Sequence, residues 1–556
     1  MEKIKKVISQ YYFVLLVSIV ILFAFILRYY YTNIGLPYLY YWDEPQIAST
    51  ALNMIKTGDL NPRFFAYGTF MIYANVVVDI LHYFSLMATT PEDINYLGSL
   101  NDIKINVDTG WKWSISHPSF YHANRVFSVL LATGTVFVTY LIGTILFNRY
   151  IGLIGATFLA LLPFHIMRSV WISADSPSAF FVLLVVLFSL LFIETKKESY
   201  LILSLVFAGI AITSKYNTAL SIFIPLLSLV WVFITSKESI KTYMWFLIPT
   251  IPIIIFLIIM PYSIIELPRF LDHVGGEIRH YKVLGQGVDD SAKAGLPHLK
   301  IQLINFYHHL GFVNSIMVLL GIVGVFFRPL FIFTLIMPLL YISYMMGTKV
   351  SYHRNFIQVY PFIALLFASG FYTLYKILNR LKEQLPLLSK YNSAGIVAIV
   401  SLFFIAPQAY SSLSEAIVQK EARDSRTHAV YAINSIQGFS NIVIAKELRI
   451  HPQELKLLKL PYTIEPLLTI STQKSQEKTL YILPALISSS QWEKDKNKIY
   501  AMRKFIASLD KASILQTIQK NDTGDTRAYV GVTRLHYFSV TPTILFAKNL
   551  TQDKNR

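Results

Sequence analysis

The chain has 556 residues, no cysteine, and 49 Lys and Arg against 32 Asp and Glu, a formal net charge of +17. Charged residues make up 15% and hydrophobic residues 54%, with a mean hydropathy of +0.49, whereas soluble domains carry about 25% charged residues. These values exclude a soluble enzyme, a disordered chain, a nucleic-acid-binding domain, disulfides and thiol catalysis, and they predict an integral membrane protein.

Eleven apolar segments approach the roughly 20 residues that a membrane-spanning helix needs. The first, residues 11–30, follows a basic start and resembles a retained anchor with a cytoplasmic N-terminus rather than a cleaved signal. The others are residues 126–147, 151–167, 177–193, 200–213, 219–235, 243–262, 312–327, 330–346, 360–378 and 394–406.

Residues 64–87 are also apolar, but they contain Asp79 and His82. If this stretch crossed the membrane, the Lys and Arg clusters of the later loops would all move outside, against the positive-inside rule. We therefore expect it to lie in the outer interface.

This topology predicts two domains. Residues 1–410 form a transmembrane domain, in which residues 31–123 and 263–309 are long exterior loops. Residues 411–556 form an exterior domain with helical periods at 426–436 and 498–509 and β-branched runs at 441–445, 480–483 and 528–532, as is typical of a small α/β domain. The predicted fold is a polytopic α-helical membrane protein of the cytoplasmic (inner) membrane with about 11 transmembrane helices and a C-terminal α/β domain outside.

Two adjacent acids, Asp43 and Glu44, follow the first span in the sequence Tyr41-Trp42-Asp43-Glu44-Pro45. Carboxylates at the edge of the hydrocarbon are costly and usually functional. Asp43 could instead cap a helix that begins at Pro45. Capping explains one acid and not the pair, so we expect a functional role.

Three further charged residues fall on the same exterior side in this topology. They are Asp175, Lys215 and Arg354. Each has a simpler interpretation, since Asp175 could cap a helix, Lys215 could reach the interface, and Arg354 could be an ordinary loop charge. Their convergence with Asp43 on one exterior cavity favours a functional site.

The order of these motifs resembles the GT-C membrane glycosyltransferases, most of all the branch of protein O-mannosyltransferases and lipid A aminoarabinose transferases, which depend on a phospholipid carrier. The resemblance rests on the acidic pair, on Asn61-Pro62-Arg63-Phe64-Phe65, on Asn124-Arg125, on Ser173-Ala174-Asp175-Ser176-Pro177, on Thr213-Ser214-Lys215-Tyr216 and on Asp424-Ser425-Arg426-Thr427. The chain departs from many relatives at Phe65-Ala66-Tyr67-Gly68, where they have His-Pro-Pro-Leu.

The resemblance implies a polyprenyl-phosphate sugar as donor and a hydroxyl of a lipid, glycan or protein as acceptor. Asp43 would be the general base, and Glu44 or Asp175 would position it or the acceptor. The remaining implied residues are Lys215, Arg354 and Tyr216 around the donor phosphate, and Trp42, Tyr67, Tyr352 and His353 in the acceptor pocket. Transfer would invert the anomeric centre, and a monophosphate donor would require no metal cofactor, although a divalent ion stays a secondary possibility.

Three alternatives remain open on the sequence. A polytopic transporter also has many spans, but it usually shows paired repeats with broken helices, which this sequence lacks. A lipid-linked glycan polymerase, ligase or oligosaccharyltransferase would use the same donor class. A structural membrane scaffold would need none of the charged residues. The sequence identifies neither the sugar, nor the acceptor, nor the oligomeric state.

Overall fold

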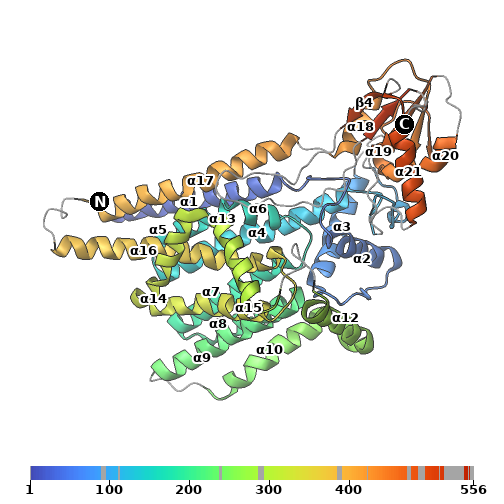
Figure 1. The fold of residues 1–556 in the computed structure, drawn as a ribbon. Coiled ribbons are helices and arrows are strands. Elements are labelled where there is room, and N and C mark those ends of the chain that lie inside the picture. Colours follow the sequence, from blue (N-terminus) through green and yellow to red (C-terminus); the bar gives the residue numbers. More distant parts are fainter. Residues whose placement is uncertain are drawn as a thin grey trace.

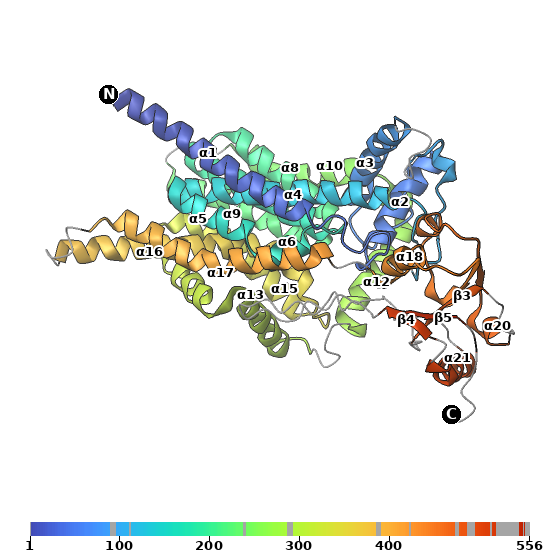
Figure 2. The same ribbon diagram turned by 90° about the horizontal axis from the view of Figure 1, so that it is seen from above.

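The computed structural model describes residues 2–88, 96–110, 113–236, 241–285, 293–384, 391–421, 424–472, 478–485, 495–511, 514–518, 544–548 and 550. A helical bundle carries a small mixed sheet at one end (Figures 1 and 2). The run 528–532, predicted as a strand, lies outside the described residues. Helices α7 (Asp175–Thr195) and α16 (Tyr360–Gln384) are central, each 83% buried over its most apolar stretch.

The eleven predicted spans are all helical. Eight coincide with segments long and apolar enough to cross a membrane, and three are shorter apolar helices, so the chain is a multi-pass membrane protein. Besides α7 and α16, they are α1 (Glu2–Tyr29), α4 (Ser119–Leu146), α5 (Arg149–Ala160), α8 (Glu198–Ser214), α9 (Phe223–Thr235), α10 (Tyr243–Ile259), α13 (Leu296–Ile322), α15 (Phe333–Met346) and α17 (Ser393–Glu421).

Short helical turns complete the bundle and its connections. They are α6 (Pro163–Arg168), η2 (Tyr216–Ile222), α11 (Tyr262–Ile265), η3 (His280–Leu284), α14 (Gly324–Phe327), η4 (Pro329–Ile332) and η5 (His353–Val359). Small residues let the long helices approach closely, as in other membrane bundles. A Cβ on Gly321 of α13 would lie 1.9 Å from the carbonyl oxygen of Leu366 in α16, so only glycine fits there.

Helices α2 (Glu44–Thr57) and α3 (Phe70–Met87) lie at the end of the bundle that carries the sheet, and η1 (Leu100–Asp102) follows them. Helix α3 is itself long and apolar enough to span a membrane. We predicted that α3 lies in the outer membrane interface; its place beside α2 agrees with this, and the interfacial position stays a prediction. The N-terminus and the C-terminal end of α16 lie at the opposite end of the bundle (Figure 2).

The C-terminal domain contains a five-stranded sheet in the order β2-β1-β3-β5-β4. Strand β1 runs parallel to β2 and β3, and β5 runs antiparallel to β3 and β4. The elements are α18 (Ser425–Ile433), β1 (Asn441–Ala445), η7 (Lys446–Leu448), α19 (Pro452–Leu455), β2 (Tyr462–Glu465), α20 (Leu467–Thr472), β3 (Thr479–Pro484), α21 (Lys496–Ser508), β4 (Ile514–Ile518) and β5 (Ile544–Ala547). The predicted α/β character is therefore confirmed.

Helices overlap two of the predicted boundaries, and the division into two domains stays a prediction. Helix α17 continues to Glu421, so the bundle extends past residue 410, because Pro407 is accommodated inside this helix. The predicted loop 263–309 is largely helical: α12 (Leu267–Arg279) begins with a proline in its first turn, and α13 already begins at Leu296. Proline in the first turn costs no hydrogen bond, which explains why both helices can start there.

Candidate active site

A cavity of about 820 Å³ is lined by residues of α2 and α12, two helices at the end of the bundle that carries the sheet (Figure 1). Four stretches far apart in the sequence meet around it: the start of α2, the start of α7, the end of α8, and the loop before η5. Helix α12 covers a further side. Eight of the ten predicted site residues line the cavity: Trp42, Asp43, Tyr67, Asp175, Lys215, Tyr216, Tyr352 and Arg354.

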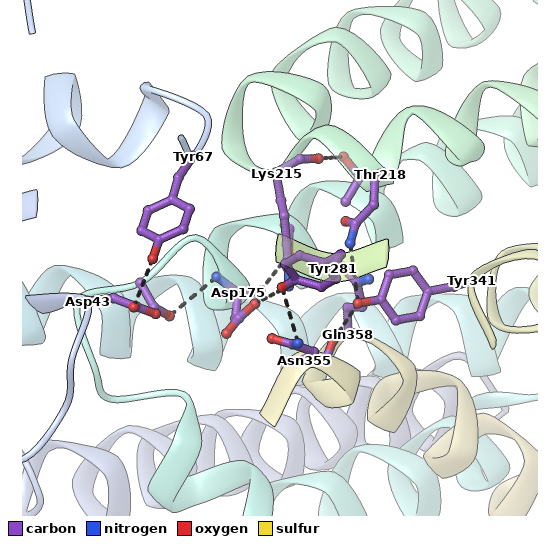
Figure 3. Close-up of polar contacts among 12 residues, drawn as sticks. Asp43, Tyr67, Asp175, Lys215, Thr218, Tyr281, Tyr341, Asn355 and Gln358 are labelled. Atoms are coloured by element: carbon purple, nitrogen blue, oxygen red, sulfur yellow. Dashed lines mark hydrogen bonds and ion pairs between the residues drawn. The ribbon is translucent and has the colours of Figure 1, made fainter. Parts of the chain in front are cut away.

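Asp43 stands at the N-cap position of α2, but its side chain makes no capping hydrogen bond. Its carboxylate instead accepts a hydrogen bond of 3.0 Å from the hydroxyl of Tyr67 (Figure 3). The negative charge of Asp43, together with burial, raises the pKa of Tyr67 well above its usual value, so this phenol stays protonated and donates. The carboxylate is thus held in the cavity and is not used to start the helix.

Asp175 and Lys215 form an ion pair inside the cavity. The Nζ atom of Lys215 lies 2.5 Å from Oδ1 of Asp175, and both side chains are largely buried. The hydroxyl of Tyr41 donates to the other carboxylate oxygen at 3.4 Å. Asp175 is the first residue of α7, while Lys215 caps the end of α8. Most of the charge of Lys215 is therefore already balanced by Asp175.

Arg354 is the second cation of the cavity. Its guanidinium lies 5.0 Å from the ring centre of Tyr41 and 4.7 Å from that of Tyr352, an arrangement that holds the group between two aromatic faces. Among the described residues it has no ion pair with a carboxylate. Its five N–H donors are thus oriented by stacking and remain free for an anion.

The loop that carries Tyr67 is fixed against α8. The hydroxyl of Tyr216 donates to the carbonyl oxygens of Phe65 and Tyr67 at 2.8 and 3.1 Å. A Cβ on Gly68 would lie 2.0 Å from the carbonyl oxygen of Thr213. Glycine at this position therefore lets the loop approach closely enough to bring Tyr67 to Asp43.

Helix α12 contributes an acid that the sequence interpretation missed. Glu277 lines the cavity, and burial, followed by the charge of Asp43, raises its pKa to about 7. Tyr281, just after α12, accepts a hydrogen bond of 3.2 Å from the amide of Asn355, beside Arg354 (Figure 3). A proline at the start of an amphipathic stretch within 263–309 was the available signal for this helix.

Glu44 does not line this cavity. It forms a forked ion pair with Arg125 of α4, with two N–O distances of 2.7 Å, and both side chains are fully buried. Arg125 also donates to the carbonyl oxygens of Thr32 and Ile34, at 2.9 and 2.8 Å. The carboxylate of Glu44 thus ties the loop before α2 to the bundle, and its role in positioning Asp43 or the acceptor stays a prediction.

His353 also lies away from the cavity lining. Its two ring nitrogens contact Oε1 of Gln302 and the hydroxyl of Tyr360, each at 2.6 Å, inside the bundle. Its neighbour Arg354 faces the cavity instead, because η5 begins at His353 and turns the two side chains apart. His353 was predicted for the acceptor pocket, and that role stays a prediction for a residue that does not line the cavity.

The C-terminal domain contacts the chain just before Asp43. The hydroxyl of Tyr38 donates to Glu454 at 2.5 Å, and that of Tyr40 donates to Asp424 at 3.0 Å. Arg426 pairs with Asp424 at 2.8 Å and lies 3.4 Å above the Tyr38 ring. These buried contacts anchor the C-terminal domain to the loop that carries Asp43.

Residues 121–264 match the model of the dolichyl-phosphate-mannose-protein mannosyltransferase family. This match confirms the predicted resemblance to GT-C membrane glycosyltransferases. No curated protein shows significant similarity to the chain.

The solved structures that match the chain include ArnT from Cupriavidus metallidurans in the apo state, with 11% identity, a TM-score of 0.45, and coverage of 98% of this chain and 100% of that chain. ArnT bound to undecaprenyl phosphate has the same identity and TM-score, with coverage of 97% and 99%. The oligosaccharyltransferase AglB from Archaeoglobus fulgidus, in complex with an inhibitory peptide and a dolichol-phosphate, has 11% identity and a TM-score of 0.46, with coverage of 89% and 72%.

Proposed function

We propose that this chain, which resembles the GT-C membrane glycosyltransferases, moves a hexose or pentose from a polyprenyl-phosphate donor to a hydroxyl of a lipid, glycan or protein. One observation supports this above all: a carboxylate that caps no helix, Asp43, and a guanidinium without a carboxylate partner among the described residues, Arg354, line the same cavity. A base and an anion site are what such a displacement needs.

In the proposed reaction Asp43 takes the proton of the acceptor hydroxyl. The acceptor oxygen attacks the anomeric carbon from the side opposite the phosphate, the bond between that carbon and the phosphate oxygen breaks, and the polyprenyl phosphate leaves. One displacement of this kind inverts the anomeric centre. A positioned base contributes typically 10²–10⁴-fold to the rate.

Arg354 would bind the departing phosphate through its planar fork, and Lys215 would assist from its pair with Asp175. Negative charge develops on the phosphate oxygens as the bond to the sugar breaks, so cations fixed in a partly dry cavity act mainly on the transition state. The proposed reaction uses these side chains and no metal ion. Tyr67 would keep Asp43 aimed at the acceptor.

The proposed site lies on the exterior face of the cytoplasmic membrane, with the N-terminus in the cytoplasm. The ion pairs Arg328–Glu194, at 3.3 Å, and Lys241–Glu198, at 3.9 Å, bring together loops that the positive-inside rule assigns to the cytoplasm. Helices α2 and α12, which contribute to the cavity lining, lie with the sheet at the other end of the bundle (Figure 1). Both observations support this orientation.

The test is donor consumption. Purified full-length protein is incubated with radiolabelled polyprenyl-phosphate sugars and a membrane extract from a host strain lacking the protein, and the lipids are separated by thin-layer chromatography. We expect one labelled donor to disappear while label appears in an acceptor. A transporter would leave every donor chemically intact, and that result would refute the proposal. Transfer of whole oligosaccharides in place of single sugars would identify a polymerase or ligase.

A further inference from the structure

A second cavity, of about 550 Å³, adjoins the first along α2. It shares Gln46 and Trp113 with the catalytic cavity, so the two cavities are adjacent. Its volume falls in the range of small-molecule sites, about 300–1,000 Å³. We call it the α2 groove; it is lined by Gln46, Ser49, Thr50, Asn53, Met54, Thr57, Asp59, Asn61, Pro62, Arg63, Ile105, Asn106 and Trp113.

One side of the α2 groove is a polar helix face. Gln46, Thr50, Asn53 and Thr57 follow at the spacing that places side chains on one face of a helix. The opposite face of α2 is apolar and buried, with Ala48, Ala51 and Leu52 among its members. The row of amides and hydroxyls therefore runs along the groove and leads from Thr57 toward Asp43, at the start of the helix.

Two amides of the α2 groove are unused by the fold. The side chains of Asn53 and Asn106 are exposed and make no hydrogen bond with any other described residue. Each amide offers two donors and an acceptor with two lone pairs. A sugar hydroxyl both donates and accepts, so two free amides match it better than they match an anion or an apolar chain.

The charges in the α2 groove cancel. Arg63 pairs with Asp59 at 2.7 Å, so the groove presents no net charge to a ligand. Trp113 is 41% exposed where the two cavities meet, and the hydroxyl of Ser49 donates to its carbonyl oxygen. An exposed indole offers a flat apolar face on which the C–H side of a sugar ring can stack.

We infer that the α2 groove binds the acceptor, and that the acceptor is a neutral glycan whose terminal hydroxyl reaches Asp43 past Trp113. This inference rests on the proposed function and adds the acceptor class to it. The aromatic face would align the sugar ring next to the acid, and the amides of Asn53 and Asn106 would bind the units behind it. An acceptor held at two places in this way presents a single hydroxyl to the base.

The experiment measures transfer from the donor that the wild-type protein consumes, using the host membrane extract as acceptor. Asn53→Ala and Trp113→Ala should each raise the apparent KM for the extract at least tenfold. Hydrolysis of the donor by water should stay unchanged in Asn53→Ala, because Asn53 lies outside the catalytic cavity. Alanine suits an exposed helical position, so this variant should fold. Asn101→Ala, an exposed asparagine outside both cavities, is the matched control.

The chemical class is tested on the extract itself. Periodate, which cleaves vicinal diols, should abolish acceptor activity, and protease should leave it intact. An unchanged apparent KM in both groove variants would overturn the site. Transfer that survives periodate and is lost after protease would overturn the glycan and identify a peptide acceptor. Failure of the proposed function would look different, because the wild-type protein would then consume no donor at all.

Discussion

Replacement of Arg354 by alanine tests the anion site, with polyprenyl phosphate, the leaving group, as the only ligand. The guanidinium is held between Tyr41 and Tyr352 and has no carboxylate partner among the described residues. A hydrogen bond to a charged group contributes about 1.5–3 kcal/mol, and 1.4 kcal/mol corresponds to a factor of ten in Kd. We therefore expect Arg354→Ala to weaken polyprenyl phosphate binding roughly 10- to 150-fold.

The assay is equilibrium binding of radiolabelled polyprenyl phosphate to purified protein in detergent. Arg354→Lys should give an intermediate Kd, because lysine keeps the charge but loses the fork and the planar stack. Lys349→Ala is the matched control, since this exposed lysine on the same loop does not line the cavity. A Kd in Arg354→Ala equal to that of wild type would refute the assignment of the phosphate to this residue.

Three other predictions follow from the geometry. Burial raises the pKa of Glu277 to about 7, so its carboxyl is neutral below this pH and charged above it. The charged carboxylate repels the donor phosphate, so donor affinity should fall as the pH rises through 7 in wild type and stay constant in Glu277→Gln. Parallel pH profiles of the two proteins would contradict this. Glu44→Gln leaves Arg125 buried without its partner, which should destabilise the protein by about 3–5 kcal/mol in thermal unfolding, and an unchanged melting temperature would show that the pair is dispensable. In this cysteine-free chain, Asn101→Cys should react with an impermeant thiol reagent on intact cells and Lys197→Cys only after permeabilisation, whereas the reverse would invert the topology.

The sequence predicted the bundle well because each span is a long apolar run with polar ends. It also predicted that Asp43, Asp175, Lys215 and Arg354 converge, since topology alone places them on one side. It could not show which carboxylate faces the cavity. Asp43 and Glu44 are adjacent, and only the position of Arg125, far along the chain, decides that Glu44 turns inward.

The sequence was least informative where amphipathic helices replace apolar spans. Glu277 and Tyr281 lie in a stretch with too few apolar residues to resemble a span, so it was taken for a loop, although it folds over the cavity as α12 and the turn after it. The C-terminal strands β2 and β4 were also missed. Strand β2 is short and largely exposed, so its sequence shows little alternation of apolar and polar residues. Tertiary contacts, and not local pattern, determine these elements.

Asp43→Asn tests the central claim most directly. Asparagine matches aspartate in size and could still accept a hydrogen bond from Tyr67, but it cannot take a proton. We predict that the variant binds polyprenyl phosphate with a Kd within about twofold of wild type and loses sugar transfer by about 10²–10⁴-fold, while wild-type transfer is unaffected by excess EDTA. Full transfer activity of Asp43→Asn would contradict the role of Asp43 as the base, and loss of wild-type activity in EDTA would show that the acids of the cavity hold a metal ion instead.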